Sequence, residues 1–176
     1  MYLGIDIGGT KVLALVFDQK GVVRGRGKKK VKERTPAAVL DRAVTCAELA
    51  LEGAGVPAAR LRGTGLAVPS SVHEGRALFA PALGWRNVPI AALAARRFPG
   101  PIAVGNDVNL GMLAEFHLGA ARQAGLAVGF FLGTGVGGAI LQCGQVLAGA
   151  DGLGGELGHQ IVVPGGRRCG CGNAGC

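Results

Sequence analysis

The sequence predicts an α/β protein with a duplicated two-domain architecture, of which the second copy is only partly represented. Residues 5–10 and 130–138 both read as a strand, a turn of glycine and threonine, and a second strand. An internal repeat of this kind suggests duplication. Between these hairpins, short apolar runs typical of strands are interspersed with segments whose apolar residues have helical spacing.

Residues 1–105 read as a complete first domain. Its longest helix is expected to begin at Pro36, because Thr35 is a favourable N-cap and proline suits the first helical position. The apolar residues that follow keep helical spacing, and the segment 53–57, Gly-Ala-Gly-Val-Pro, should end the helix. Strands are expected over 2–7, 11–17, 21–32, 61–68 and 101–104, and a short helix over 89–98.

Residues 106–176 read as the start of a second domain. Leu110, Leu113, Ala114 and Leu118 are spaced to make one face of a helix apolar. Strands are expected over 126–132 and 137–142, on either side of a turn rich in glycine. No helical pattern that would cover this second sheet follows, so we expect the chain to be incomplete for its fold.

Composition excludes some classes of function. The chain has 176 residues, 49% of them hydrophobic. No apolar stretch reaches the roughly 18 residues that a membrane-spanning helix needs, and the start reads as a strand rather than a signal peptide. We therefore expect a cytoplasmic protein with no membrane partner. Of the 5 cysteines, those at 169, 171 and 176 are clustered, which in such a chain favours metal binding over disulfides.

The formal net charge of +8 comes largely from one basic stripe. Its residues occupy alternate positions, so they lie on one face of a strand. A nucleic-acid surface is one interpretation; the other is an edge strand that lysines protect from aggregation. We favour the second, and expect no nucleic-acid partner, because no aromatic residues interleave. The stripe consists of Arg24, Arg26, Lys28, Lys30, Lys32 and Arg34.

The first glycine turn has the residue types of a phosphate site. Glycines let backbone N–H groups approach an anion, the Thr10 hydroxyl adds a donor, and Asp6 can hold a magnesium ion through water. The spacing is not that of a Walker loop, and many tight hairpins contain paired glycines. The similar turn at 133–135 strengthens the interpretation of a phosphate held between two domains. The residues concerned are Asp6, Gly8, Gly9, Thr10, Lys11, Gly133, Thr134 and Gly135.

Asn106 and Asp107 are expected at a strand-to-helix junction. Both residue types are common N-caps, which is one interpretation. The other is a general base in a cleft, since the N-terminus of a helix would keep the Asp107 carboxylate ionised and able to accept a proton. The spacing alone does not choose between them.

The last eighteen residues contain the ligands of a tetrahedral zinc site. His159, Cys169, Cys171 and Cys176 supply one imidazole and three thiols in a stretch rich in glycine. Glu156 lies three residues before His159, so the metal would shape whatever the two residues bind. With one ring nitrogen on zinc, the other nitrogen of His159 would be a fixed hydrogen-bonding group.

Together these motifs resemble the ROK family of sugar kinases and sugar-responsive repressors, which has the actin-like ATPase (ribonuclease H-like) fold. The resemblance covers the whole chain, and the order of the motifs makes it specific. The motifs are Asp6-Ile-Gly-Gly-Thr10, Leu83-Gly-Trp85 with Val88-Pro89, Asn106-Asp107-Val-Asn109, Leu132-Gly-Thr-Gly135, Glu156-Leu-Gly-His159 and Cys169-Gly-Cys171-Gly-Asn-Ala-Gly-Cys176.

The resemblance implies ATP-dependent phosphorylation of a hexose, most simply of glucose to glucose 6-phosphate, with Asp107 as the general base. It also implies Mg²⁺, a structural Zn²⁺, and sugar binding by Asn106, Asp107, Glu156 and His159. Family members continue past the zinc motif, so the chain would be an N-terminal portion whose full-length form is a homodimer or larger homo-oligomer. Two alternatives remain, a non-catalytic sugar-sensing repressor and an inactive truncated product. Three departures from the family pattern, Ser70, Ala82 and Gly105, bear on sugar preference.

Overall fold

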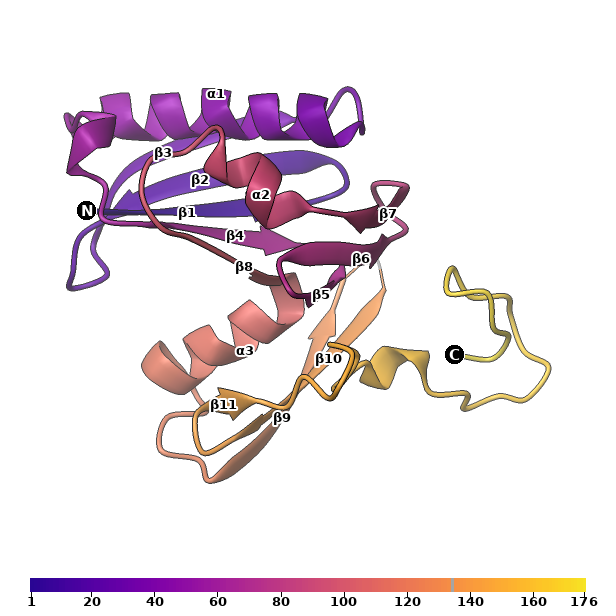
Figure 1. The fold of residues 1–176 in the computed structure, drawn as a ribbon. Coiled ribbons are helices and arrows are strands. Elements are labelled where there is room, and N and C mark those ends of the chain that lie inside the picture. The colour runs from indigo at the N-terminus through magenta and orange to yellow at the C-terminus, as the bar shows by residue number, and fades with distance from the viewer. Residues whose placement is uncertain (134) are drawn as a thin grey trace. The chain divides into compact units, whose positions relative to one another are not determined.

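The chain divides into two compact units, Met1–Asp107 and Val108–Cys176. The structure, a computed structural model, describes residues 1–133 and 135–176 (Figure 1). The sequence-based boundary was placed after residue 105. Over the described residues, no helix has both the length and the apolar character needed to cross a membrane.

The first unit is built on a five-stranded sheet in the order β3-β2-β1-β4-β8. β1, β2 and β3 are antiparallel neighbours, whereas β4 runs parallel to β1 and β8 runs parallel to β4. All of the strands expected in this unit are present; β3 and β4 are shorter than expected, and β8 ends two residues later. These strands are β1 (Tyr2–Ile7), β2 (Lys11–Phe17), β3 (Val23–Lys30), β4 (Thr64–Val68) and β8 (Ile102–Asn106).

Helix α1 (Pro36–Ala54) covers one face of this sheet (Figure 1). It begins as predicted: the Thr35 hydroxyl accepts a hydrogen bond from the backbone N–H of Ala38 at 3.3 Å. It ends at Gly55, which has a φ of 63° and donates to the last carbonyls of the helix. The core beneath it is aliphatic and includes Leu3, Ile5, Val12, Val16, Val39, Leu40 and Leu66.

Two glycines let α1 lie close to β3. A Cβ at Gly25 would collide with the carbonyl oxygen of Ala50, and a Cβ at Gly27 with that of Cys46. Residues 25 and 27 of β3 therefore face the helix without side chains. The basic side chains at 24, 26, 28 and 30 are exposed. β3 is the terminal strand of its sheet, as the edge-strand interpretation of the stripe requires.

A second, three-stranded sheet in this unit was not expected from the sequence. It contains β5 (Ser71–His73), β6 (Arg76–Ala80) and β7 (Trp85–Val88), in that order. The Trp85 indole N–H donates to the carbonyl of Arg34 at 2.6 Å, which ties this sheet to the segment before α1. The short helix α2 (Ile90–Ala95) follows and buries Ile90 and Ala94.

The second unit contains a small antiparallel sheet in the order β11-β10-β9 and most of helix α3 (Asp107–Leu118). Its core consists of Met112, Ala139 and Leu141. Both expected strands are present, and a short strand and a 3₁₀ turn were missed. The elements are β9 (Leu126–Leu132), β10 (Val136–Gln142), β11 (Gln145–Val146) and η2 (Leu157–His159).

The predicted apolar face of α3 was only partly right, since Leu113 packs against the core of this unit but two other predicted residues do not. Leu118 is 78% exposed and Ala114 is also exposed. The side that packs carries Val108, Met112 and Phe116, which are four residues apart. Gly111 explains why this side of the helix packs. A Cβ at residue 111 would come within 2.9 Å of the Phe131 ring, so the lack of a side chain there lets β9 approach the helix.

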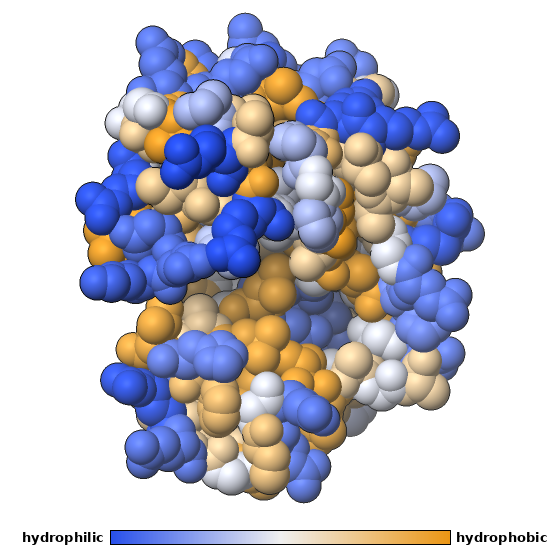
Figure 2. Space-filling view, turned by 60° about the vertical axis from the view of Figure 1, so that its left-hand side comes forward, coloured by the Kyte–Doolittle hydropathy of each residue, from blue (hydrophilic) through white to orange (hydrophobic). Residues whose placement is uncertain are grey.

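Hydrophobic side chains remain exposed at the surface (Figure 2). A regular set belongs to β9, the terminal strand of the sheet in the described part of the second unit. Alternate residues on a strand share one face, so these side chains form an uncovered apolar face. They are Leu126, Val128, Phe130 and Leu132.

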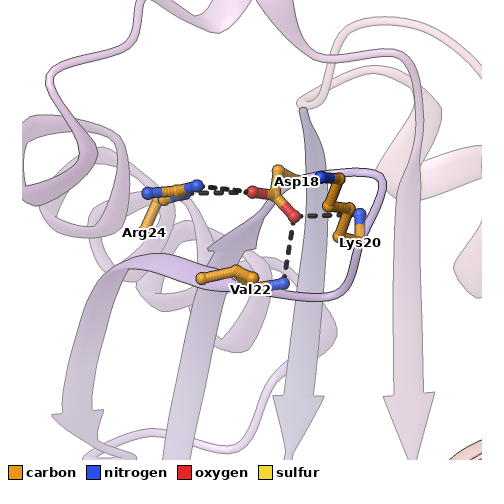
Figure 3. Close-up of polar contacts among 4 residues, drawn as sticks. All are labelled: Asp18, Lys20, Val22 and Arg24. Atoms are coloured by element: carbon orange, nitrogen blue, oxygen red, sulfur yellow. Dashed lines mark hydrogen bonds and ion pairs between the residues drawn. The ribbon is translucent and has the colours of Figure 1, made fainter.

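The turn between β2 and β3 is organised by Asp18 (Figure 3). One carboxylate oxygen accepts from the backbone N–H groups of Lys20 and Val22 at 2.9 and 3.0 Å. The other accepts from the Arg24 guanidinium at 2.7 Å. This turn occupies residues 18–22, which is why β3 begins later than expected. The hydrogen bonds from Arg24 and from the backbone hold the pKa of Asp18 below its ordinary value.

We predict that Asp18→Asn lowers the melting temperature at neutral pH. Because the pKa of this carboxyl is lower in the folded protein than in the unfolded chain, its contribution is present above the unfolded pKa, near 4, and is lost as pH falls through the folded value. The difference in melting temperature between wild type and variant should shrink below about pH 4. Glu52→Gln, at an exposed position on α1, is the control. A difference independent of pH would contradict the prediction.

Candidate functional site

The carboxyl ends of three parallel strands meet at one edge of the first sheet. In the register, Asp6 of β1 lies opposite Ala67 of β4, and Val68 of β4 lies opposite Asn106 of β8. Ligands of open α/β sheets bind at this edge. The predicted residues of the first unit therefore gather there, on the segments that leave β1, β4 and β8.

The glycine turn after β1 is a tight hairpin. The N–H of Gly8 donates to the carbonyl of Lys11 at 2.9 Å, so this N–H closes the turn. A phosphate would be met by the other groups of the turn. Gly9 is close to a neighbouring segment, because a Cβ there would lie 3.1 Å from the Cβ of Ala82 and 3.2 Å from its carbonyl oxygen.

Asp6 and Lys11 flank this turn, and both side chains are exposed. Loss of hydration raises the pKa of Asp6 above its ordinary value, and the positive charge of Lys11 opposes this shift. Because the Asp6 side chain keeps contact with solvent, this pKa shift changes the stability of the fold only slightly. A carboxylate with a raised pKa gains from a nearby cation, and this suits Asp6 to a hydrated magnesium ion.

Asn106 and Asp107 stand at the predicted junction: β8 ends at Asn106, and α3 begins at Asp107. The Asn106 amide donates to the carboxylate of Asp107 and to the carbonyl of Ser70, both at 3.2 Å. Asp107 is half-buried and lies in the first turn of α3, where the helix dipole favours a negative charge. The Asn106 amide thus orients the Asp107 carboxylate at a position where a negative charge is favoured.

Ser70 is a positioning residue that sequence reasoning missed. Its hydroxyl donates to the carbonyl of Ser71 at 2.8 Å and accepts from the N–H of Phe79 at 3.2 Å. The residue is 3% exposed. These bonds fix the carbonyl that receives the Asn106 amide. The only sequence signal was that Ser70 departs from the family pattern after Pro69.

The second glycine turn belongs to the second unit. The N–H of Gly133 donates to the carbonyl of Gly135 at 2.9 Å, and neither glycine has a neighbour that a Cβ would meet within 4 Å. Thr134, predicted to bind phosphate with them, lies outside the described residues.

Glu156 and His159 are joined by the 3₁₀ turn η2. The N–H of His159 donates to the carbonyl of Glu156 at 3.1 Å, so both side chains leave from one turn. Glycines allow this turn to lie on β10: a Cβ at Gly158 would collide with the carbonyl oxygen of Val136, and one at Gly138 would come within 2.5 Å of Leu157. The Glu-Leu-Gly-His pattern thus reflects packing as well as chemistry.

The four predicted metal ligands come together in the second unit. One donor atom from each of His159, Cys169, Cys171 and Cys176 lies within 4.8 Å of the others. The Cys169 Sγ is 3.5 Å from His159 Nδ1, and the sulfurs of Cys171 and Cys176 are 3.8 Å apart.

These two distances between ligand atoms fit tetrahedral coordination of a zinc ion. With Zn–S near 2.3 Å and Zn–N near 2.1 Å, a regular tetrahedron has edges of about 3.8 Å between two sulfurs and about 3.6 Å between sulfur and nitrogen. The chemistry of the donors, thiolate and imidazole, also suits zinc. His159 would coordinate through Nδ1, which leaves Nε2 as a fixed hydrogen-bonding group.

The cysteine loop is a short turn that glycine makes possible. The N–H of Cys169 donates to the carbonyl of Asn173 at 2.8 Å, and Gly172 has a φ of 102°. Hydrogen bonds from the Cys171 backbone and thiol lower the pKa of Cys169 to about 7. Loss of hydration and the neighbouring thiols raise the pKa of Cys176 to about 11. Neighbouring cysteines contribute to both shifts, because the sulfurs lie close together.

Comparison with known proteins identifies relatives across the chain. A family model described as ROK family matches residues 2–176. Glucokinase of Streptomyces coelicolor is 33% identical over 174 residues, covering 99% of this chain and 54% of that protein. A putative xylose repressor of Caldicellulosiruptor is 28% identical over 185 residues, covering 100% and 45%. The chain thus spans about half the length of the curated relatives it matches.

Solved structures give the same picture. A ROK family glucokinase from Streptomyces griseus, in complex with glucose and AMPPNP, matches with a TM-score of 0.89 at 32% identity, over 99% of this chain and 55% of that one. An inorganic polyphosphate/ATP-glucomannokinase from Arthrobacter matches with a TM-score of 0.79 at 30% identity, over 92% and 64%. The predicted actin-like ATPase fold is confirmed, and the coverage agrees with a second domain that is only partly represented.

We predict that Ser70→Ala destabilises the first unit by about 1–3 kcal/mol, because it leaves a partly buried N–H without its acceptor. Ser71→Ala is the matched control, since Ser71 is also buried and follows directly. Denaturant unfolding measures the difference. The side-chain amide signal of Asn106 in an NMR spectrum should move in Ser70→Ala only. Equal behaviour of the two variants would contradict the positioning role.

Proposed function

The chain belongs to the ROK family, and we propose that it forms part of an ATP-dependent hexose kinase with glucose as the default acceptor. The observation that carries this proposal is Asp107, a carboxylate at the start of α3 with the Asn106 amide bonded to it at 3.2 Å. The similarity to glucokinases supports the assignment. A carboxylate at the active edge of the sheet is the group that sugar phosphorylation requires.

In this mechanism Asp107 accepts the proton of a sugar hydroxyl, most simply the 6-hydroxyl. The freed oxygen attacks the γ-phosphorus of ATP in line, and ADP leaves. Asn106 holds the carboxylate in its orientation, while the N-terminus of α3 stabilises its negative charge. Asp6 would hold, through water, a magnesium ion that neutralises charge on the transferring phosphoryl group.

The remaining residues bind substrates. The turn at 8–11 and the turn containing Gly133 and Gly135 would take the phosphates of ATP. Asn106, Glu156 and His159 would bind hydroxyl groups of the sugar. Glu156 accepts hydrogen bonds, the Asn106 amide both donates and accepts, and Nε2 of His159, which carries the proton when Nδ1 is on zinc, donates. The set can therefore satisfy several hydroxyls.

We predict that Asp107→Asn in the intact full-length protein lowers kcat by more than about 10²-fold, the contribution expected of a general base. Coupled detection of ADP and of sugar phosphate measures the rate. Asp151→Asn, an exposed carboxylate in the second unit, should leave the rate unchanged. Full activity of the Asp107 variant would eliminate it as the base.

A sugar-sensing repressor is the second candidate, because repressors also match this chain. It would bind sugar without transferring phosphate. Retention of Asp107 favours the kinase, since a sensor needs no base. Calorimetric sugar binding with no ADP formation in the full-length protein would favour the repressor. The inactive truncated product remains a third candidate for a polypeptide of this length alone.

We also propose that His159, Cys169, Cys171 and Cys176 hold one structural zinc ion. The donor set and its spacing support this. Zinc binding would fix His159, and through η2 it would fix Glu156, on the same turn. The metal would thereby order a sugar-binding loop without taking part in the transfer.

Zinc analysis by mass spectrometry tests this assignment. We predict about one zinc per chain in the wild type, and a clear loss in Cys171→Ser, because three ligands close a structural site poorly. Cys143→Ser is the matched control, since Cys143 is exposed and lies outside the cluster. Unchanged zinc content in Cys171→Ser would refute the ligand set.

A further inference from the structure

We propose that the outward row of β3, defined as Arg26, Lys28 and Lys30, binds the extended chain of an inorganic polyphosphate and leads one end of it to the turn at residues 8–10. The Arthrobacter relative makes this polyanion a candidate phosphoryl donor. The location of its binding surface is an inference from this chain alone. The transfer step rests on the proposed kinase function, but the binding surface can be tested separately.

The outward row is a product of how the first unit packs. Gly25 and Gly27 pack against the backbone of α1, so the alternate positions 26, 28 and 30 of β3 face away from the helix. All three members of the row are exposed, and β3 ends the sheet. A chain of phosphates can therefore approach this edge without meeting another strand of the unit.

The charges of the outward row are available to a ligand. Arg24 is not included, because Asp18 holds its guanidinium at 2.7 Å and compensates its charge. Within the described residues, no ion pair joins Arg26, Lys28 or Lys30 to a carboxylate. Asp6, before the turn, and Glu33, after β3, are carboxylates close in sequence to these ends, and both are exposed.

The outward row leads directly to the proposed phosphate turn. Lys30 pairs across the strands with Lys11, so the row gains a fourth cationic group next to the turn. The N–H of Val31 also donates to the carbonyl of Thr10 at 2.9 Å, which holds the end of β3 against the turn. Alternate residues on a strand are about 6.7 Å apart, so residues 26–30 span about 13 Å, the length of several phosphate units.

Chemistry favours polyphosphate over nucleic acid. Single-stranded nucleic acids are held by aromatic side chains on which bases stack, as well as by cations. The partners of the outward row on β2 are Leu13 and Leu15, opposite Lys28 and Arg26. The nearest aromatic pair, Tyr2 and Phe17, stack on each other at 6.0 Å near the opposite end of the hairpin. A ligand made only of phosphate groups needs no such surface.

The transfer that this surface would serve is balanced. The sugar oxygen forms a bond to the terminal phosphorus, and the bridging P–O bond to the next phosphate breaks. The bridging electrons stay with the polyphosphate, which is shortened by one unit, and the sugar proton goes to Asp107. ATP has too few phosphates to extend along the outward row, so the row distinguishes the two donors.

The test compares the intact full-length protein with Lys28→Gln/Lys30→Gln and with Arg96→Gln. Arg96 is exposed on the segment after α2, away from β3, and controls for the loss of positive charge. Calorimetry with short-chain inorganic polyphosphate at several salt concentrations gives affinity and salt dependence. We expect the double variant to bind at least about tenfold more weakly, with a salt slope smaller by about 2, and Arg96→Gln to match the wild type.

Two results would overturn the proposal. One is equal polyphosphate affinity in the double variant and the wild type. The other is a single-stranded DNA of equal charge that binds the wild type as tightly and loses affinity equally in the double variant, which would make the surface a nucleic-acid site. Thermal unfolding of both variants checks that the fold is retained, and Arg26→Gln provides a second variant of the same row.

A rate measurement separates this proposal from the kinase assignment. The ratio of polyphosphate-dependent to ATP-dependent sugar phosphate formation should fall about tenfold in the double variant and stay constant in Arg96→Gln. If no donor supports transfer while the double variant still loses polyphosphate binding, the surface is supported and the kinase assignment fails. A ratio unchanged in the double variant would contradict delivery along β3.

Discussion

The parallel register of β1, β4 and β8 is the constraint on which the candidate site depends. It brings the ends of three strands, far apart in the sequence, to one edge of the sheet. Asp6, Ser70 and Asn106 then need only short segments to meet there. The hydrogen bonds from Asn106 to the Ser70 carbonyl and to Asp107 join the ends of β4 and β8. A shift of one residue in either pairing would turn these side chains to the other face of the sheet.

Close approach at glycines sets the remaining positions. α1 can lie on β3 because residues 25 and 27 have no side chains, and η2 can lie on β10 because of Gly158. In both places the glycine contacts orient neighbouring side chains. The basic side chains of β3 point away from the helix, and His159 follows directly after Gly158 in the packed turn. These glycines thus contribute indirectly to the candidate site, because the close packing that they allow determines which adjacent side chains are exposed.

Local signals in the sequence were sufficient for much of this. Thr35 and Pro36 located the start of α1, and the strand before Asn106 located the junction with α3, because caps and breakers act within a few residues. β5 to β7 could not be found in this way. Their strands are only three to five residues long. The turn between β5 and β6 also places Glu74 at a φ of 48°, and glutamate is not a residue type that favours positive φ. The side of α3 that packs is set by Phe131, which lies 20 residues after Gly111. The role of Ser70 is set by Phe79, which lies on the next strand but one. Neither partner is close enough in sequence for a local pattern to reveal it.

The two sets of site residues differ in what holds them. Those of the first unit rest on a sheet with a large aliphatic core, and hydrogen bonds hold the Asn106 and Ser70 side chains. Residues 160–176 form no regular helix or strand, and Ile161, Val162 and Val163 are exposed, so burial contributes little to their order. Where a core is too small to order a loop, bonds to a metal can do so. Three of the four clustered ligands lie in this segment and the fourth is His159. The segment that lacks a core is therefore the one that carries the proposed metal ligands. Zinc bound there would take the place of a core in ordering the turn that presents Glu156 and His159.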